Sequence, residues 1–255
     1  MSWFPFLLQL FALGVLGAVA TVPFRDIGKY YFKFHATLAL LAATLGILLG
    51  RPWEAGTGPF LARMLAFAFA AAVLLENGIV RAAGRDLRKD ALLLPVSVGV
   101  PYAAVVAFTL AGWGVGGAVL SAVHYWTAAA VLGTSMVAMT TGHWYLSNAK
   151  LSFDILVRLC GLFVLATGAK TVVSVIYAVA RYEEYLRLED FWLLVFGVRV
   201  GAGELMALVL GLMSLSCARR RANQSATGIL YVAVVFVLIG ETISLYLTLG
   251  RGWPL

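Results

Sequence analysis

The sequence has 255 residues, of which 62% are hydrophobic and only 12% are charged. An ordinary soluble domain has roughly 45–50% apolar and about 25% charged residues, and the mean hydropathy here is +0.93. The apolar residues fall in long uninterrupted blocks that no single soluble core of this length covers. A water-soluble domain is therefore excluded, and so are disordered, collagen-like and coiled-coil chains.

A transmembrane helix needs about 20 mainly apolar residues to cross about 30 Å of hydrocarbon. Eight blocks satisfy this requirement, and they are separated by short connections. The predicted spans are 3–22, 33–50, 59–80, 91–112, 116–140, 152–179, 190–216 and 226–249. We therefore predict an all-α, polytopic integral membrane helical bundle of about eight transmembrane helices, forming a single transmembrane domain over residues 1–255.

The distribution of basic residues predicts the orientation of this bundle. Alternate connections assign twelve basic residues to one side of the membrane: Arg25, Lys29, Lys33, Arg81, Arg85, Arg88, Lys89, Lys150, Arg158, Arg219, Arg220 and Arg221. The other side receives five: Arg51, Arg63, Arg181, Arg187 and Arg251. The positive-inside rule makes the larger group cytoplasmic and both termini non-cytoplasmic, in a multi-pass protein of the cell (inner) membrane. Topology and anionic lipid then account for the net charge of +7, and no nucleic-acid partner is expected.

The cysteines and histidines limit the metal chemistry that the chain can hold. Cys160 and Cys217 both lie inside apolar blocks without a CxxC pattern, so we predict no cysteine-ligated iron–sulfur or zinc site and no other metal site. Three histidines are too few for a haem–copper oxidase core or a dihaem cytochrome b. One b-type haem remains arithmetically possible, with His35 and His143 as its two ligands.

Two other interpretations of these histidines stay open. His35 opens the second predicted helix and His143 closes the fifth, both on the cytoplasmic side. They lie beside aromatic residues typical of a membrane interface, namely Tyr30, Tyr31, Phe32, Trp144 and Tyr145. Both histidines are therefore candidates for ordinary interfacial residues or for proton handling.

Four ionisable residues are predicted near the middle of the bilayer. Lys170, Arg199 and Glu241 lie on three different helices, each about 12–15 Å from the outer end at 1.5 Å per residue, and Glu204 lies about a turn and a half deeper on the helix of Arg199. Each such residue costs roughly 2.5–3.5 kcal/mol on insertion scales, so unpaired they would oppose insertion by roughly 10 kcal/mol together. We expect a mutually paired cluster, which either marks a proton or substrate path or only sets the helix register.

A fifth ionisable residue, Glu76, precedes Asn77 near the cytoplasmic end of the third predicted helix. Its position fits the mouth of a proton path, and it also fits a solvated helix end. The sequence leaves both interpretations open.

The last helix contains Leu238-Ile239-Gly240-Glu241, followed by Ser244 and Leu245-Tyr246. This segment resembles the Gly-Glu…Arg…Phe-Tyr ending of membrane anchor subunits of the DMSO reductase and NrfD type, although Ser244 stands near the place of the family's arginine. Eight helices with both termini outside also look like the DMSO reductase anchor. Such a subunit carries no metal, binds quinol and passes electrons to an iron–sulfur partner on the outer face. The resemblance carries the quinone-binding position over to Glu241, and Tyr246, in the same segment, is a candidate cofactor-binding residue.

Three functions are compatible with these features. The first is a quinone-interacting, proton-handling membrane subunit of an electron-transfer complex, in which Glu241, Glu204, Lys170 and Arg199 carry the chemistry. The second is a proton-coupled transporter or exporter of a small anionic solute, held by Lys170 and Arg199. The third is a single-haem cytochrome b-like protein. The sequence does not decide between an enzyme subunit and a transport protein.

Overall fold

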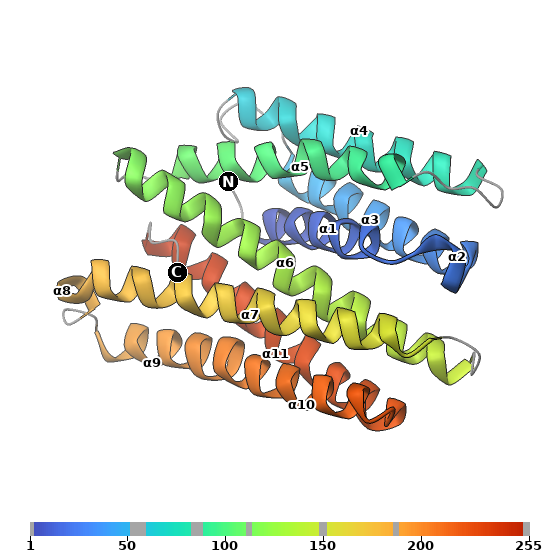
Figure 1. The fold of residues 1–255 in the computed structure, drawn as a ribbon. Helices are drawn as coiled ribbons and strands as arrows, with labels where there is room; N and C mark the ends of the chain where they lie inside the picture. Colours follow the sequence, from blue (N-terminus) through green and yellow to red (C-terminus); the bar gives the residue numbers. More distant parts are fainter. Residues whose placement is uncertain are drawn as a thin grey trace. The chain divides into compact units, whose positions relative to one another are not determined.

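The structure is a computed structural model that describes residues 3–51, 60–82, 89–110, 114–147, 152–185 and 189–251 (Figure 1). The basic residues Arg85, Arg88, Lys150 and Arg187, which the predicted orientation uses, lie outside these ranges. The backbone contacts divide the chain into two compact units, Met1–Gly133 and Thr134–Leu255. We describe each unit by itself, and the single domain over 1–255 stays a prediction.

Unit 1 contains α1 (Trp3–Ala20), α2 (Phe24–Ile27), α3 (Lys29–Gly50), α4 (Phe60–Ala82), α5 (Lys89–Leu110) and most of α6 (Gly114–Ser147). Helix α1 packs against α3 and α5, and α4 packs against the same two helices. Helix α1 also approaches α6 closely, because a Cβ atom at Gly14 of α1 would overlap the backbone of Ala129 on α6. Such small residues let membrane helices approach closely.

Unit 2 contains the end of α6, α7 (Asp154–Ala180), α8 (Tyr182–Tyr185), α9 (Asp190–Val198), the π-helical segment η1 (Arg199–Met206), α10 (Ala207–Arg219) and α11 (Asn223–Arg251). The segments α9, η1 and α10 follow one another without a break, over 30 residues from Asp190 to Arg219. Helix α10 packs against α7 and α11, and η1 packs against α11. One membrane-length helix of this unit therefore has a π turn in its middle.

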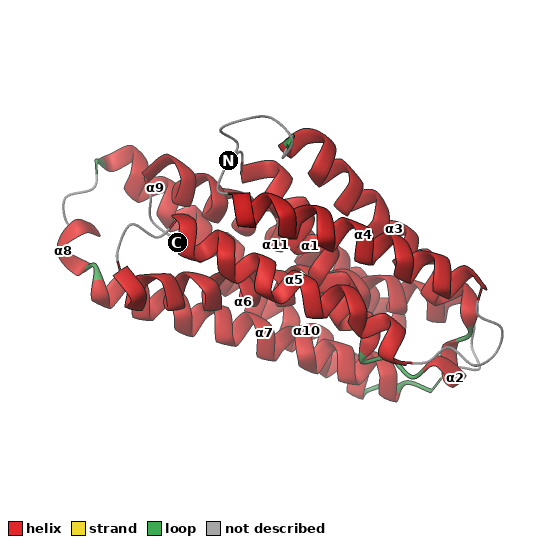
Figure 2. Cartoon of the chain, turned by 90° about the horizontal axis from the view of Figure 1, so that it is seen from above, coloured by secondary structure: helices red, strands yellow, loops and turns green. Residues whose placement is uncertain are grey.

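Every regular element in the described residues is a helix, and these residues contain no strand (Figure 2). Six segments are long and apolar enough to cross a membrane, namely Lys29–Gly50, Phe60–Ala82, Leu92–Thr109, Asp154–Ala180, Asp190–Arg219 and Asn223–Thr248. Helix α1 has 18 residues, and α6 has 34 residues but carries polar side chains along its length. The predicted all-α polytopic bundle is confirmed. The ends of most helices lie within a few residues of their predicted positions, but α6 runs to Ser147 rather than to 140.

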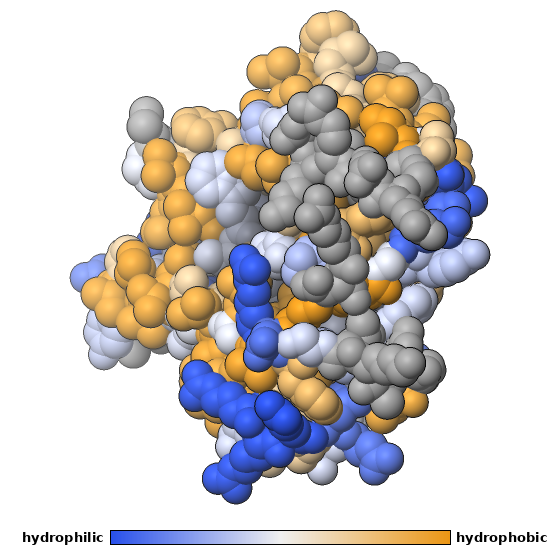
Figure 3. All heavy atoms as spheres, turned by 45° about the vertical axis from the view of Figure 1, so that its right-hand side comes forward, coloured by the Kyte–Doolittle hydropathy of each residue, from blue (hydrophilic) through white to orange (hydrophobic). Residues whose placement is uncertain are grey.

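The exposed side chains of these helices are largely apolar. On α3, Leu41, Leu45 and Leu48 are 58%, 48% and 55% exposed, and on α7 Val172 and Val179 are 59% and 73% exposed. The face drawn in Figure 3 has broad apolar areas and, apart from them, a group of hydrophilic side chains. Apolar surface of this extent is unfavourable in water and favourable in lipid. The chain is a multi-pass integral membrane protein.

Candidate functional site

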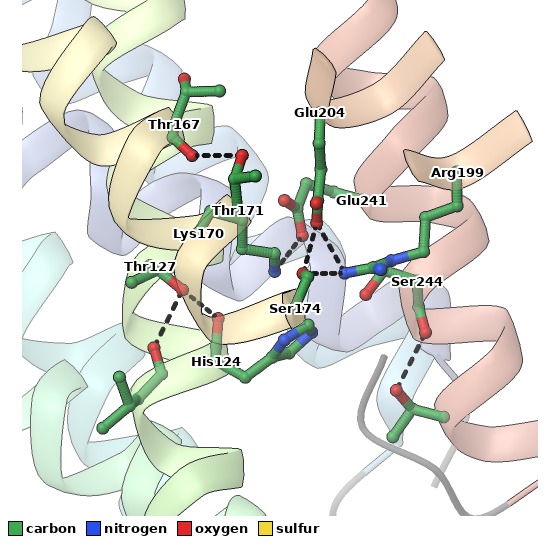
Figure 4. A network of polar contacts seen from close by, with 12 residues as sticks. His124, Thr127, Thr167, Lys170, Thr171, Ser174, Arg199, Glu204, Glu241 and Ser244 are labelled. Carbon is green, nitrogen blue, oxygen red and sulfur yellow. Dashed lines mark hydrogen bonds and ion pairs between the residues drawn. The ribbon is translucent and has the colours of Figure 1, made fainter. Parts of the chain in front are cut away.

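Four charged side chains of unit 2 meet in its interior and form two ion pairs (Figure 4). Lys170 of α7 lies with its Nζ atom 3.0 Å from Oε2 of Glu241 on α11. Arg199 lies with Nη2 at 2.7 Å from Oε1 of Glu204, and both belong to η1. All four residues are at most 5% exposed. The predicted pairing of these residues is therefore confirmed, whereas their role stays a prediction.

Ser174 connects the two halves of the Arg199–Glu204 pair from the neighbouring helix α7. Its hydroxyl donates a hydrogen bond to Glu204 Oε1 at 2.6 Å and accepts one from Arg199 Nη2 at 2.9 Å. Ser174 lies one helical turn after Lys170, so both side chains project from the same face of α7. Ser174 is not among the residues predicted above, although its i+4 spacing from Lys170 places it on the same helix face as that lysine.

The π-helical geometry of η1 explains why Arg199 pairs with Glu204. The two residues are five positions apart, and in an α-helix of 3.6 residues per turn they would project about 140° apart. A π-helix bonds residue i to i+5, which brings such a pair to the same face. The segment contains Gly201 and Gly203, which favour irregular backbone geometry in a helix. Isolated π turns occur frequently at functional sites.

Two glycines bring the segments that carry the carboxylates into backbone contact. Gly203 precedes Glu204 on η1, and Gly240 precedes Glu241 on α11. A Cβ atom built on Gly203 would overlap the Cα atom of Gly240. By contrast, a Cβ atom on Gly197 or Gly201 would meet nothing within 4 Å. The glycine pattern therefore reflects close packing at Gly203, next to the charged cluster.

The cluster has hydrogen-bonding atoms that are not paired with any described residue. Within the described residues, the buried atoms Nε and Nη1 of Arg199 have no hydrogen-bond partner, and neither does Oε2 of Glu204. Buried polar groups are almost always paired, so each exception needs an explanation. Two guanidinium nitrogens, with three N–H bonds between them, and one carboxylate oxygen thus have the chemistry to bind a ligand that offers both acceptor and donor atoms.

An aromatic pair lies beside the cluster, on α11 and on α9, which continues into η1. It lies between the cluster and the predicted outer ends of these helices. Tyr246 of α11 and Trp192 of α9 have their ring centres 6.0 Å apart with an angle of 22° between the planes. Tyr246 follows Glu241 by five residues and Trp192 precedes Arg199 by seven, which is about 7–11 Å along each helix. Tyr246 is 44% exposed, so the pair borders the lipid-facing surface.

The two histidines considered as haem ligands have different surroundings. His35 of unit 1 is fully buried, and its Nδ1 atom lies 2.8 Å from the carbonyl oxygen of Tyr31 in the same helix. His143 of unit 2 is exposed, and its Nδ1 atom lies 3.1 Å from the hydroxyl of Tyr231 on α11. Within the described residues, no group of three or more His, Cys, Asp or Glu side chains is placed to hold a metal ion.

Glu76 of unit 1 is buried rather than solvated. Its exposed fraction is 0%, and that of Asn77 is 4%. The interpretation of Glu76 as part of a solvated helix end is therefore wrong. The reason is that α4 continues to Ala82 and turns Glu76 towards the buried face of the helix.

Comparison with protein-family models, curated proteins and solved structures found no match to this chain. The class that the fold defines is a multi-pass helical membrane protein with a buried ion-pair cluster in its C-terminal unit. Any more specific function has to be argued from the cluster itself.

Proposed function

We propose that the protein is the membrane subunit of an electron-transfer complex, in which the cluster of unit 2 binds a quinone and handles its protons. The single observation that carries the proposal is the pair of guanidinium nitrogens of Arg199, Nε and Nη1, which are buried beside Glu204 and have no hydrogen-bond partner among the described residues. A quinone offers two carbonyl oxygens as acceptors, and each becomes a hydroxyl donor on reduction. Arg199 suits the first form and the free oxygen of Glu204 suits the second.

The aromatic pair supports a quinone over other ligands with polar oxygens. A quinone ring has two flat faces, which pack favourably on tryptophan and tyrosine rings. Trp192 and Tyr246 lie on the same segments as Arg199 and Glu241, and Tyr246 borders the lipid. A ligand with an isoprenoid tail would enter there from the bilayer. Tyr246 also belongs to the segment of the last helix that resembles membrane anchor subunits of the DMSO reductase and NrfD type.

In the proposed reaction, the oxidation of a quinol, two carboxylates accept the protons and a redox partner accepts the electrons. Oxidation of a quinol to a quinone releases two protons and two electrons. The carboxylates of Glu204 and Glu241 take up the protons, each next to a cation, and the electrons pass to a redox partner subunit that docks on the outer face. Lys170 and Ser174 hold the carboxylates in place. The reverse direction uses the same groups.

Quinone binding to the reconstituted full-length protein tests the proposal. A short-chain benzoquinone should quench the tryptophan fluorescence of the wild type at equilibrium. Loss of one charged hydrogen-bond donor costs about 1.5–3 kcal/mol, so Arg199→Gln should weaken binding at least about tenfold. Arg158→Gln is a matched control, because Arg158 lies exposed on α7. Absence of binding to the wild type, or equal affinity of both variants, would contradict the proposal.

A transporter of a small anion remains the second candidate, and the π turn favours it. Transporters bind substrates where helices are interrupted near the bilayer midplane, and η1 interrupts the α-helix between α9 and α10 with Arg199 at its start. In that function Arg199 and Lys170 bind a carboxylate while Glu204 or Glu241 carries the coupling proton. Accumulation of a labelled small carboxylate in proteoliposomes under a proton gradient, lost in Arg199→Gln, would favour transport over quinone binding.

A further inference from the structure

Unit 1 contains a buried carboxylate, Glu76, that the proposed function does not use. Glu76 lies on α4 in the stripe of buried residues that includes Phe69, Val73 and Val80. Its side chain is 0% exposed, and within the described residues neither Oε1 nor Oε2 has a hydrogen-bond partner. An ionised carboxylate without a partner in an apolar interior is so unfavourable that the group becomes neutral instead.

The nearest cation on α4 is engaged elsewhere. Arg81 donates from Nε to Oδ1 of Asn77 at 2.7 Å and from Nη2 to the hydroxyl of Thr37 on α3 at 3.0 Å. Thr37 in turn donates to the carbonyl oxygen of Lys33 at 2.8 Å. The guanidinium is thereby held at the end of α4 and gives Glu76 no direct counter-charge.

The helices that pack against α4 carry few other charged groups at this level. On α3, Lys33 is half-buried and contacts Thr37 through its backbone carbonyl, and the His35 ring bonds to Tyr31. On α5, Lys89 and Asp90 open the helix, and their side chains lie outside the described part. Within the described residues, Glu76 is thus a carboxyl group without an ion-pair partner.

Glu76 is also close to the end of its own helix. It lies six residues before Ala82, where α4 ends, which is about 9 Å at 1.5 Å per residue. Asn77 is one residue nearer to that end, on the same buried stripe, and its Nδ2 atom is buried without a hydrogen-bond partner among the described residues. Three unpartnered polar atoms on adjacent residues can hydrogen-bond a water molecule that bridges them.

We propose that Glu76 is a proton-binding site of unit 1 that exchanges its proton with the aqueous phase at the Arg81 end of α4. The site is separate from the cluster of unit 2, and the proposal does not depend on quinone binding. A carboxyl group that binds and releases a proton inside a membrane helix is the element from which proton relays are built. Asn77 is a positioning residue, which supplies a hydrogen-bond donor between Glu76 and the end of α4.

Infrared difference spectroscopy of the full-length protein in lipid vesicles tests this site directly. The wild type should have a carbonyl stretching band of a protonated carboxylic acid that Glu76→Gln removes. The band should shift when H2O is replaced by D2O and lose intensity as the pH of the bath rises. Glu189→Gln should leave it unchanged, because Glu189 is exposed.

Three outcomes would overturn the proposal. The first is that the spectra of the wild type and Glu76→Gln are the same in the carboxylic acid region. The second is a band that does not shift in D2O or respond to pH, which would make Glu76 a permanently neutral structural group. The third is a band that Na⁺ removes at constant pH, which would make it a cation site. If Glu76→Gln does not fold, Glu76→Asp serves instead, because it keeps the acid and displaces its band.

Discussion

Gly203 and Gly240 contact each other backbone to backbone, and each immediately precedes one of the two carboxylates of the buried cluster. The contact brings the backbones of η1 and α11 together, with no room for a Cβ atom between them. The positions of Glu204 and Glu241 therefore depend on the close packing of these two glycines as well as on the ion pairs. The first prediction follows from this relationship.

Replacement of Gly203 by alanine should destabilise the protein, because the added Cβ atom overlaps Gly240. Overpacking of this kind costs about 1–3 kcal/mol, so the midpoint of thermal unfolding in detergent should fall. Gly201→Ala is the control in the same π segment, since its Cβ atom meets nothing within 4 Å. That variant should be neutral or slightly more stable. Equal stability of the two variants would show that the segments do not touch at Gly203.

Neutralising Glu241 should destabilise the protein more than removing the whole ion pair. Glu241→Gln leaves the Lys170 ammonium buried without its partner, and breaking such a pair costs about 3–5 kcal/mol. The double variant Lys170→Met with Glu241→Leu replaces both charges with apolar groups, so it should recover most of the stability. Thermal unfolding in detergent measures both effects.

The same two variants separate a functional cluster from a structural one. If the cluster handles protons, the double variant should be folded but inactive in membranes, with quinone-dependent electron transfer as the readout. A double variant that is both stable and fully active would show that the Lys170–Glu241 pair only sets the helix register.

The predicted orientation can be tested by cysteine labelling in a background in which Cys160 and Cys217 are replaced by alanine. Asp86→Cys and Ala222→Cys should be protected from a membrane-impermeant thiol reagent in intact cells, because the excess of basic residues places both connections in the cytoplasm. Glu183→Cys, on the opposite side, should be labelled. Labelling of both Asp86→Cys and Ala222→Cys from outside would reverse the orientation.

The purified protein should have no b-type haem spectrum. The hydrogen bonds of His35 to Tyr31 and of His143 to Tyr231 explain both imidazoles without a cofactor. The absorption spectrum of reduced and oxidised protein decides the matter. A Soret band with a sharp reduced α-band, lost in His143→Ala, would restore the single-haem interpretation.

Hydropathy alone determined that the chain crosses a membrane as a helical bundle, and it located most helix ends to within a few residues. The reason is that the bilayer forces every backbone polar group to be satisfied within its own helix, so long apolar blocks have one structural solution. The cost of charges in lipid likewise predicted that Lys170, Arg199, Glu204 and Glu241 would be paired.

Only the tertiary structure decided which residues pair and which stay unpartnered. The partners depend on how far each helix is rotated about its axis and on where its neighbours approach, and the hydropathy of one segment contains neither quantity. The π turn moved Glu204 to the face of Arg199, Gly203 and Gly240 let η1 and α11 approach each other closely, and packing of α4 enclosed Glu76. Each of these features arises from contacts between segments far apart in the sequence or from a local change in helical period, which is why an α-helical projection of the sequence misplaces them.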